Sequence, residues 1–198
     1  GGEPAFYEDL EESLLALGEA LRARTYRPDP YRYFSLRNRK ERVVSEASFR
    51  DRVVHHALVA ALEPVFEPRF YEHSYACRKG KGQHAAVERV RRLSRRHRYF
   101  LRLDVERYFE SVHHGTLMAL LGASVLDEGI LWLCETLLAH ASSSPNGSGP
   151  GRGLPIGNLT SQFWANVYLD PFDRLVARAM GCGTHTRYMD DAAVLGGT

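Results

Sequence analysis

The stretch HTRYMDDAAVLGG, residues 185–197, carries two adjacent aspartates between two short strand-like segments. This pattern is typical of a β-hairpin whose turn lies at the Met-Asp-Asp step. Adjacent carboxylates repel each other, and the charge is costly unless water, a basic side chain or a cation compensates it. Taken alone, Asp190 and Asp191 are better explained as a solvated turn than as a catalytic site.

A third aspartate ends another predicted strand. YFLRLD, residues 99–104, begins with the period-two alternation of a strand and places Asp104 at its end. If this strand and the hairpin are neighbours in one antiparallel sheet, the three carboxylates meet at one edge. Such hard oxygen ligands favour Mg²⁺ or Mn²⁺. The alternative is that Asp104 caps a helix and that the aspartate pair is an exposed turn.

The rest of the chain alternates predicted helices with a few strands, which favours a mixed α+β arrangement. Pro171 is expected to kink or break the last helix, and no internal repeat is visible. The expected helices span residues 6–26, 49–66, 113–121, 127–140 and 158–180, and residues 78–98 form a basic loop that leads into a further helix. A basic turn at residues 37–44 lies between two short strands. We expect two lobes, a basic one over residues 1–97 and an acid-bearing one over residues 98–198.

Composition describes an ordinary globular protein, with 44% apolar and 25% charged residues and a formal net charge of +2. No apolar run approaches the roughly 20 residues that span a bilayer, and no leader is visible. A cytoplasmic protein without a membrane partner is the expectation. Three cysteines without a paired spacing predict reduced thiols: Cys77, Cys134 and Cys182.

Basic residues cluster in the first half of the chain, at residues 36–42, 77–82 and 89–98. The last cluster, RVRRLSRRHR, has six arginines and no acid. Such patches favour a surface that faces a polyanion. Solvated faces balanced by acids elsewhere remain the alternative.

Five motifs, in order along the chain, resemble those of the reverse transcriptases, and of the bacterial ones in particular. RYMDD resembles the YxDD signature, and LRLDVERYFESVHH resembles an earlier motif in which a strand-end aspartate precedes an aromatic pair. The other three are FRDRVVHHAL at 49–58, SYACRKGKGQHAA at 74–86 and GLPIGNLTSQFWANVYLDPFD at 153–173. Together they are spread over nearly the whole chain from Tyr33 onward, which makes the resemblance more specific than a lone YMDD would.

This resemblance implies a right-hand polymerase with fingers over residues 1–97 and a palm, an antiparallel sheet with packed helices, over 98–198. The implied activity is RNA-directed DNA synthesis, in which dNTPs are added to a DNA or RNA primer on an RNA template. Asp104, Asp190 and Asp191 match the catalytic carboxylates, which hold two Mg²⁺ or Mn²⁺ ions with help from the backbone of Val105. Two ions would stabilise the attacking and leaving oxygens of phosphoryl transfer.

The resemblance also implies residues that bind nucleotide and nucleic acid. Phe109 matches the steric gate that selects dNTPs over rNTPs, although a plain core aromatic is the alternative. Arg42, with Lys40 or Arg37, matches the cations that hold the triphosphate, because the planar guanidinium binds phosphate oxygens in pairs. The remaining implied contacts are Ile156, Gly157 and Gln162 toward the nucleotide, and Arg78, Lys79, Lys81, Tyr188 and Met189 toward the nucleic acid.

One departure from the family pattern concerns residues 156–162, IGNLTSQ. Ile156 stands where most of these enzymes have Gln, and Gln162 where they have Pro. This variant resembles the reverse transcriptases of diversity-generating retroelements, which copy template adenines with errors and for which a basic accessory protein is a further partner. Retron, group II intron and phage-defence reverse transcriptases share most of the other motifs.

A complete reverse transcriptase continues into a helical thumb, whereas this chain ends seven residues after Asp191. We therefore expect a fingers–palm fragment that extends primers poorly. A catalytically inactive, nucleic-acid-binding relative is the second hypothesis. A metal-dependent phosphodiesterase is the third, and it would need neither Phe109 nor the basic finger loop.

Overall fold

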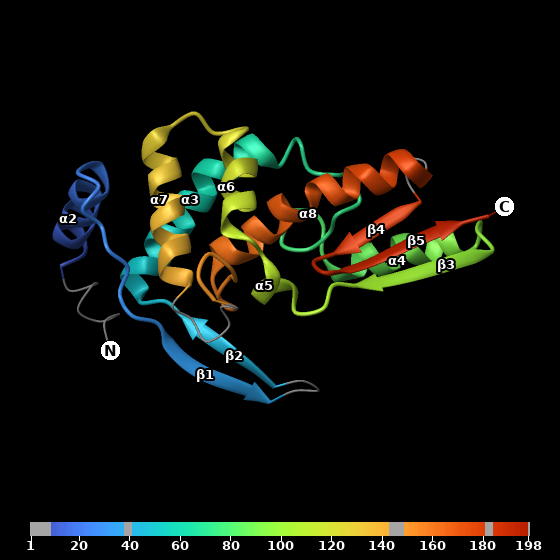
Figure 1. Ribbon diagram of the computed structural model, residues 1–198, viewed down its shortest axis with the longest axis horizontal. Coiled ribbons are helices and arrows are strands. Elements are labelled where there is room, and N and C mark those ends of the chain that lie inside the picture. The colour runs from blue at the N-terminus through green and yellow to red at the C-terminus, as the bar shows by residue number, and fades with distance from the viewer. Residues whose placement is uncertain (1–8, 38–40, 143–148, 181–183, 198) are drawn as a thin grey trace. The chain divides into compact units, whose positions relative to one another are not determined.

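The computed structural model describes residues 9–37, 41–142, 149–180 and 184–197 (Figure 1). Helices and antiparallel strands alternate along the chain, which confirms the mixed α+β arrangement expected from the sequence. The elements are α2 (Leu10–Arg22), β1 (Arg32–Arg37), β2 (Glu41–Glu46), α3 (Phe49–Phe66), α4 (Gln83–Ser94), β3 (Tyr99–Asp104), α5 (Tyr108–Ser111), α6 (His114–Gly122), α7 (Glu128–Ala141), α8 (Leu159–Met180), β4 (His185–Tyr188) and β5 (Asp191–Gly196).

Contacts divide the chain into two compact units, each made of two segments. The first unit comprises Gly1–Val65 and Phe109–Ser161, and the second comprises Phe66–Tyr108 and Gln162–Thr198. These two units interleave along the sequence, whereas the division into lobes at residue 98 stays a prediction. The functional names fingers and palm remain a prediction.

In the first unit, leucines of α3, α6 and α7 form a buried core next to the antiparallel β1–β2 hairpin. Each fully buried leucine contributes about 1.5–3 kcal/mol relative to an exposed one. Two of these helices have a side-chain cap at their N-terminus. At α7 the carboxylate of Asp127 accepts from the N–H of Ile130 at 2.9 Å, and at α6 the side chain of His113 accepts from the N–H of Thr116. The buried leucines are Leu58, Leu62, Leu117, Leu121, Leu137 and Leu138.

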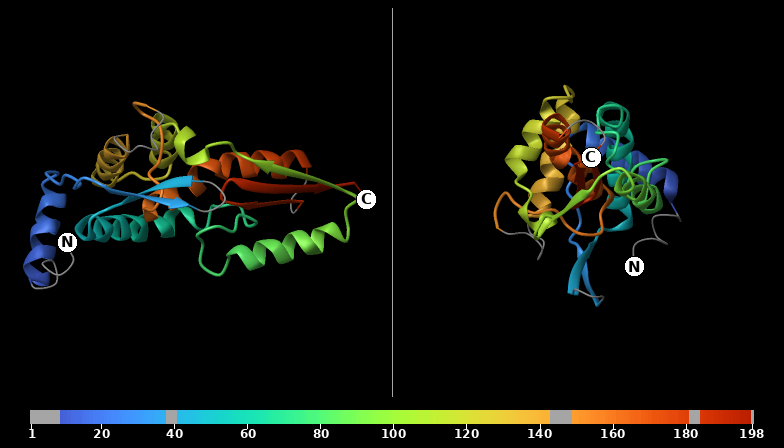
Figure 2. Two further views of the ribbon diagram at one scale, coloured as in Figure 1. Left: turned by 90° about the horizontal axis from the view of Figure 1, so that it is seen from below. Right: turned by 90° about the vertical axis from the view of Figure 1, so that its right-hand side faces the viewer.

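The second unit is built on a three-stranded antiparallel sheet in the order β3-β5-β4. Helix α8 lies on one face of the sheet and α4 on the other (Figure 2). Side chains of β4 alternate between the two faces: Arg187 contacts Asp173 of α8, whereas Thr186 lines an apolar groove of about 580 Å³ along α4. Phe163 of α8 packs against the rings of Phe66 and Phe70 in a buried aromatic cluster.

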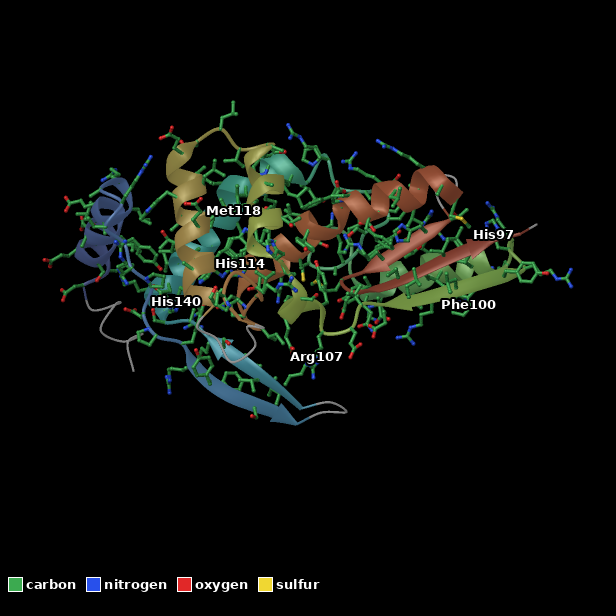
Figure 3. The ribbon with its side chains drawn as sticks, viewed as in Figure 1. His97, Phe100, Arg107, His114, Met118 and His140 are labelled. Carbon is green, nitrogen blue, oxygen red and sulfur yellow. The ribbon has the colours of Figure 1, made fainter. Side chains whose placement is uncertain are left out.

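Strand β3 departs from the burial that its alternating sequence predicts. Tyr99, Phe100 and Leu101 are exposed by 65%, 63% and 55%, and Phe100 is labelled on this strand in Figure 3. Successive side chains of a strand point to opposite faces, so neither face of β3 is covered at these three residues. Alternation therefore predicted the strand correctly, but it did not predict that both faces are exposed.

Helix α8 runs from Leu159 to Met180 with Pro171 inside it, so of the kink or break expected there the break is absent. A proline removes one helical hydrogen bond, and the burial of Trp164, Val167 and Ala177 along the same helix offsets that loss. The short helix α5 was not foreseen. Among the described residues, no helix is long and apolar enough to span a membrane.

Candidate active site

Two of the three predicted carboxylates face each other across neighbouring strands of the second unit. Asp104, the last residue of β3, is the register partner of Asp191, the first residue of β5. Asp190 lies in the turn between β4 and β5, where its carbonyl accepts from the N–H of Val105 at 3.3 Å. The sheet thus places Asp104 opposite Asp191 and the backbone of Asp190 next to Val105, whereas the convergence of all three carboxylates stays a prediction.

An arginine that the sequence reasoning missed contacts this edge. The guanidinium of Arg102 donates twice to Oδ1 of Asp191, from Nη2 at 2.8 Å and from Nε at 3.1 Å. This hydrogen bond raises the pKa of Arg102, which is largely exposed. The sequence did contain a sign of this contact. Residues two positions apart on a strand point to the same face, so the predicted strand already placed Arg102 on the same face as Asp104.

The donor chemistry of this edge fits a hard divalent cation. Mg²⁺ is usually bound by one or two carboxylates and otherwise keeps water or phosphate oxygens, and the side chain of Asp191 is 48% exposed. Within the described part of the chain, however, no group of three or more His, Cys, Asp or Glu side chains is arranged to hold a metal ion. Asp104 and Asp191 are the two carboxylates that the strand register places opposite each other, and their binding of a metal ion together with Asp190 stays a prediction.

Beneath the hairpin lies a buried ion pair. Arg187 and Asp173 are 1% and 0% exposed, and Nη2 of the arginine lies 2.7 Å from Oδ2 of the aspartate. Burial raises the pKa of Asp173 because its charged form loses water, and Arg187 opposes that shift. The buried ring of His185 lies beside the same carboxylate, with Nε2 at 3.5 Å, and burial lowers the pKa of this histidine.

The predicted nucleotide-binding residues lie mostly in the first unit. The carbonyl of Ile156 accepts from the N–H of Ser45 at 2.8 Å, and the carbonyl of Phe109 accepts from the N–H of Leu154 at 2.7 Å. The loop at residues 153–157 is thereby joined both to β2 and to the segment that carries Phe109. Arg42 is exposed on β2.

Gly157 makes this junction possible. Its φ is +116°, a backbone conformation that favours glycine, and a Cβ here would lie 2.8 Å from Cγ1 of Val44.

Two further cations were predicted to bind the triphosphate beside Arg42. Arg37 is the last residue of β1, and Lys40 lies outside the described residues.

The residues predicted to contact nucleic acid lie in the second unit and differ in exposure. The Arg78 side chain is only 6% exposed, and its guanidinium is bound by Glu67 and by the carbonyls of Tyr71 and Ser74. Lys79 is exposed, and Nζ of Lys81 donates to the carbonyl of Glu72 at 2.7 Å. Arg78 therefore holds its own loop in this structure.

The other predicted contact residues of the second unit are Gln162 on α8, and Tyr188 and Met189 in the β4–β5 hairpin. Gln162 is half-buried and its side-chain oxygen accepts from Sγ of Cys77 at 3.3 Å. Tyr188 is 38% exposed at the end of β4. Met189, the first residue of the turn, has a φ of +56°.

The arginine-rich helix forms a basic depression on the second unit. Side chains of α4 and the residues after it enclose about 350 Å³, and four of the five lining residues are arginines: Arg89, Arg92, Leu93, Arg95 and Arg96. Guanidinium groups bind phosphate oxygens in a planar, paired geometry. The binding of a polyanion at this surface stays a prediction, with a solvated basic face as the alternative.

Comparison with known proteins gives a consistent result. The sequence model of the family described as reverse transcriptase (RNA-dependent DNA polymerase) matches residues 32–198. Protein YkfC of Escherichia coli is 28% identical over 192 residues, which are 93% of this chain and 48% of YkfC. The group II intron-encoded protein LtrA of Lactococcus lactis is 28% identical over 170 residues, 84% of this chain and 28% of LtrA.

A plant relative matches a shorter part. Nuclear intron maturase 1 of Arabidopsis thaliana is 34% identical over 93 residues, 47% of this chain and 13% of that protein. The chain thus spans about half the length of YkfC and less of the other two relatives.

Proposed function

The chain belongs to the reverse transcriptase (RNA-dependent DNA polymerase) family, and we propose on that premise that it adds deoxynucleotides to a primer paired with an RNA template. The observation that carries the proposal is the pairing of Asp104 with Asp191, with Asp190 held next to them by the N–H of Val105. Magnesium or manganese ions bound there would supply charge stabilisation to the attacking and leaving oxygens.

The two units would then divide the work. In the second unit the three-stranded sheet serves as the palm, and its carboxylates neutralise and orient the cations of the reaction. In the first unit the β1–β2 hairpin belongs to the fingers, where Arg42 binds the triphosphate through paired hydrogen bonds. Phe109 selects against a 2′-hydroxyl, and Ile156 and Gly157 lie beside the nascent base pair.

The test is primer extension on an RNA template with Mg²⁺ or Mn²⁺, using the protein at its full natural length. Asp190→Asn should reduce the rate of nucleotide addition by ~1,000-fold, because loss of a metal-binding charge removes several kcal/mol of transition-state stabilisation. Asp127→Asn is the matched control, since asparagine also caps a helix and Asp127 only caps α7. Equal activity of Asp190→Asn and wild type would refute the assignment.

The fidelity of copying separates the retroelement type from the others. An apolar side chain at Ile156 offers no hydrogen bonds with which to enforce pairing geometry, so we propose frequent misincorporation opposite template adenine. Sequenced products of the wild type should show these errors, and Ile156→Gln should reduce them. Uniformly low error in the wild type would exclude the diversity-generating type.

A second candidate is suggested by the intron-encoded protein and the intron maturase among the relatives. In this case the chain would bind intron RNA and assist its maturation without polymerising DNA, and the basic depression on α4 would contact the RNA. Tight RNA binding by a wild type that adds no nucleotide under any divalent cation would favour this candidate.

A further inference from the structure

The turn of the β4–β5 hairpin has a strained backbone conformation, which other contacts must stabilise. Met189 has a φ of +56°, which is uncommon for a residue other than glycine and costs of the order of 1 kcal/mol or more. This residue immediately precedes Asp190. Its conformation therefore decides the direction in which the first aspartate leaves the strand.

The side chain of Arg187 reaches that turn from within the second unit. Its Nη1 donates to the carbonyl of Met189 at 2.9 Å and to Oδ1 of Asn166 at 3.2 Å. Its Nε and Nη2 donate to the carboxylate of Asp173 at distances of 2.7–2.9 Å. The planar guanidinium thus links a buried carboxylate of α8 to one carbonyl of the turn, which the single ammonium of lysine could not do in the same geometry.

The backbone of Arg187 is fixed as well. Its N–H donates to the carbonyl of His73 at 3.0 Å, and its own carbonyl accepts from the N–H of Tyr75 at 2.9 Å. The arginine is therefore anchored on both sides of its Cα before it reaches the turn.

Fixing the carbonyl of Met189 also fixes the N–H of Asp190, because both belong to one planar peptide group. On the other side of Asp190, its carbonyl is held by the N–H of Val105. Both peptide groups that flank Asp190 are thus held, one through the buried arginine and the other through the strand end that carries Asp104.

We propose that Arg187 is a positioning residue: together with Asp173 it sets the orientation of Asp190, and through it the geometry of the carboxylate edge. The catalytic consequence rests on the proposed function, whereas the effect on the turn does not. A buried ion pair by itself adds little stability, since well-packed apolar residues often replace one at no cost. The carbonyl contact to Met189 gives this pair a role that apolar side chains cannot fill.

This difference makes the proposal testable with a double variant. Asp173→Leu with Arg187→Met replaces both charges by apolar side chains of similar volume, so the melting temperature should stay near that of the wild type. Arg174→Met is the control: it removes an arginine of α8 that binds Asp170 and the carbonyl of Arg69, neither of which is a hydrogen-bond partner of the Arg187 side chain.

Two readouts are measured on the double variant, the control and the wild type. In primer extension we expect kcat of the double variant to fall by ~100-fold with little change of the KM for dNTP, because a displacement of about 1 Å costs this much. Hydrogen exchange of the Val105 amide, followed by NMR, should become at least ~10-fold faster as the turn loosens. The control should match the wild type in both.

A double variant that melts like the wild type, with wild-type kcat and wild-type protection of Val105, would overturn the proposal, since the pair would then be purely structural. If the double variant does not fold, Arg187→Lys decides by the same criteria, because it keeps the charge opposite Asp173. If the wild type itself extends no primer, the proposed function fails, and the Val105 amide alone decides whether Arg187 holds the turn.

Discussion

The two hairpins of this protein are held in opposite ways. In the β1–β2 hairpin of the first unit, Tyr33, Phe34 and Leu36 are 45%, 45% and 49% exposed. In the β4–β5 hairpin of the second unit, His185 and Arg187 are buried against α8 and Leu195 is 1% exposed. The β1–β2 hairpin thus exposes large apolar side chains to solvent, whereas the β4–β5 hairpin buries the side chains of His185 and Arg187 against α8.

This difference matches the tasks that we propose for the two. Triphosphate binding requires exposed basic side chains that can adjust to the position of the phosphates, and Arg42 on β2 is exposed. Carboxylates that share cations must keep one geometry, because catalysis depends on preorganised charges. The following variants test whether the first unit controls nucleotide binding and the second unit controls the chemistry.

The largest effect is expected at the carboxylate edge. Asp104→Asn should lower kcat for nucleotide addition by ~1,000-fold, or about 4 kcal/mol, because it removes a charge that faces Asp191. The KM for dNTP should change little, since most of the proposed nucleotide contacts lie in the first unit. Single-turnover kinetics separate the two constants, and a raised KM with normal kcat would contradict the division between the units.

Acid should destabilise the first unit through a buried histidine. His55 is 3% exposed, its Nδ1 lies 2.7 Å from Oγ1 of Thr160, and burial lowers its pKa to about 4. The unfolded chain binds this proton near pH 6.5 and the folded chain only near 4, so stability is full above pH 6.5 and falls as the pH drops toward 4. The loss is about 3 kcal/mol at most.

Urea unfolding at pH 7 and pH 4.5 measures this loss. In His55→Gln, which cannot take up the proton, the difference between the two pH values should be smaller than in the wild type. An unchanged difference would assign the acid sensitivity to other groups.

A smaller loss is expected where the first hairpin meets the 153–157 loop. Gly157→Ala should cost about 2 kcal/mol of unfolding free energy, because the new Cβ meets Val44 and the positive φ disfavours alanine. The control is Gly122→Ala at the end of α6, where a Cβ meets nothing within 4 Å. Denaturant titration of both variants checks this, and equal stabilities would contradict the close approach.

The smallest effect concerns the exposed cation. Arg42→Gln should raise the KM for dNTP by ~10-fold, equivalent to about 1.4 kcal/mol, with kcat nearly unchanged. Arg32→Gln, an exposed arginine on β1 of the same hairpin, serves as control and should leave KM unchanged. Equal effects of the two would indicate general electrostatic attraction instead of a specific contact.

Local features of this protein were determined by the sequence alone. Alternation and periodicity predicted the strand that ends at Asp104, the hairpin that turns at Met189 and Asp190, and helices such as α3 and α7, because these patterns depend on neighbours a few residues apart. The ordered motifs also predicted the family, which the match over residues 32–198 confirms.

Pairings between distant residues were decided only by the tertiary structure. Arg102 and Asp191 are 89 positions apart, Arg187 and Asp173 are 14 apart, and Gly157 meets Val44 across the first unit. The contact of the Arg78 guanidinium with Glu67 was likewise decided by packing, and the role of Arg78 toward nucleic acid, which the resemblance implies, stays a prediction. The sequence indicates only that the charge of such a residue must be compensated. Whether water, a carboxylate or a ligand compensates it depends on which segments pack against the residue.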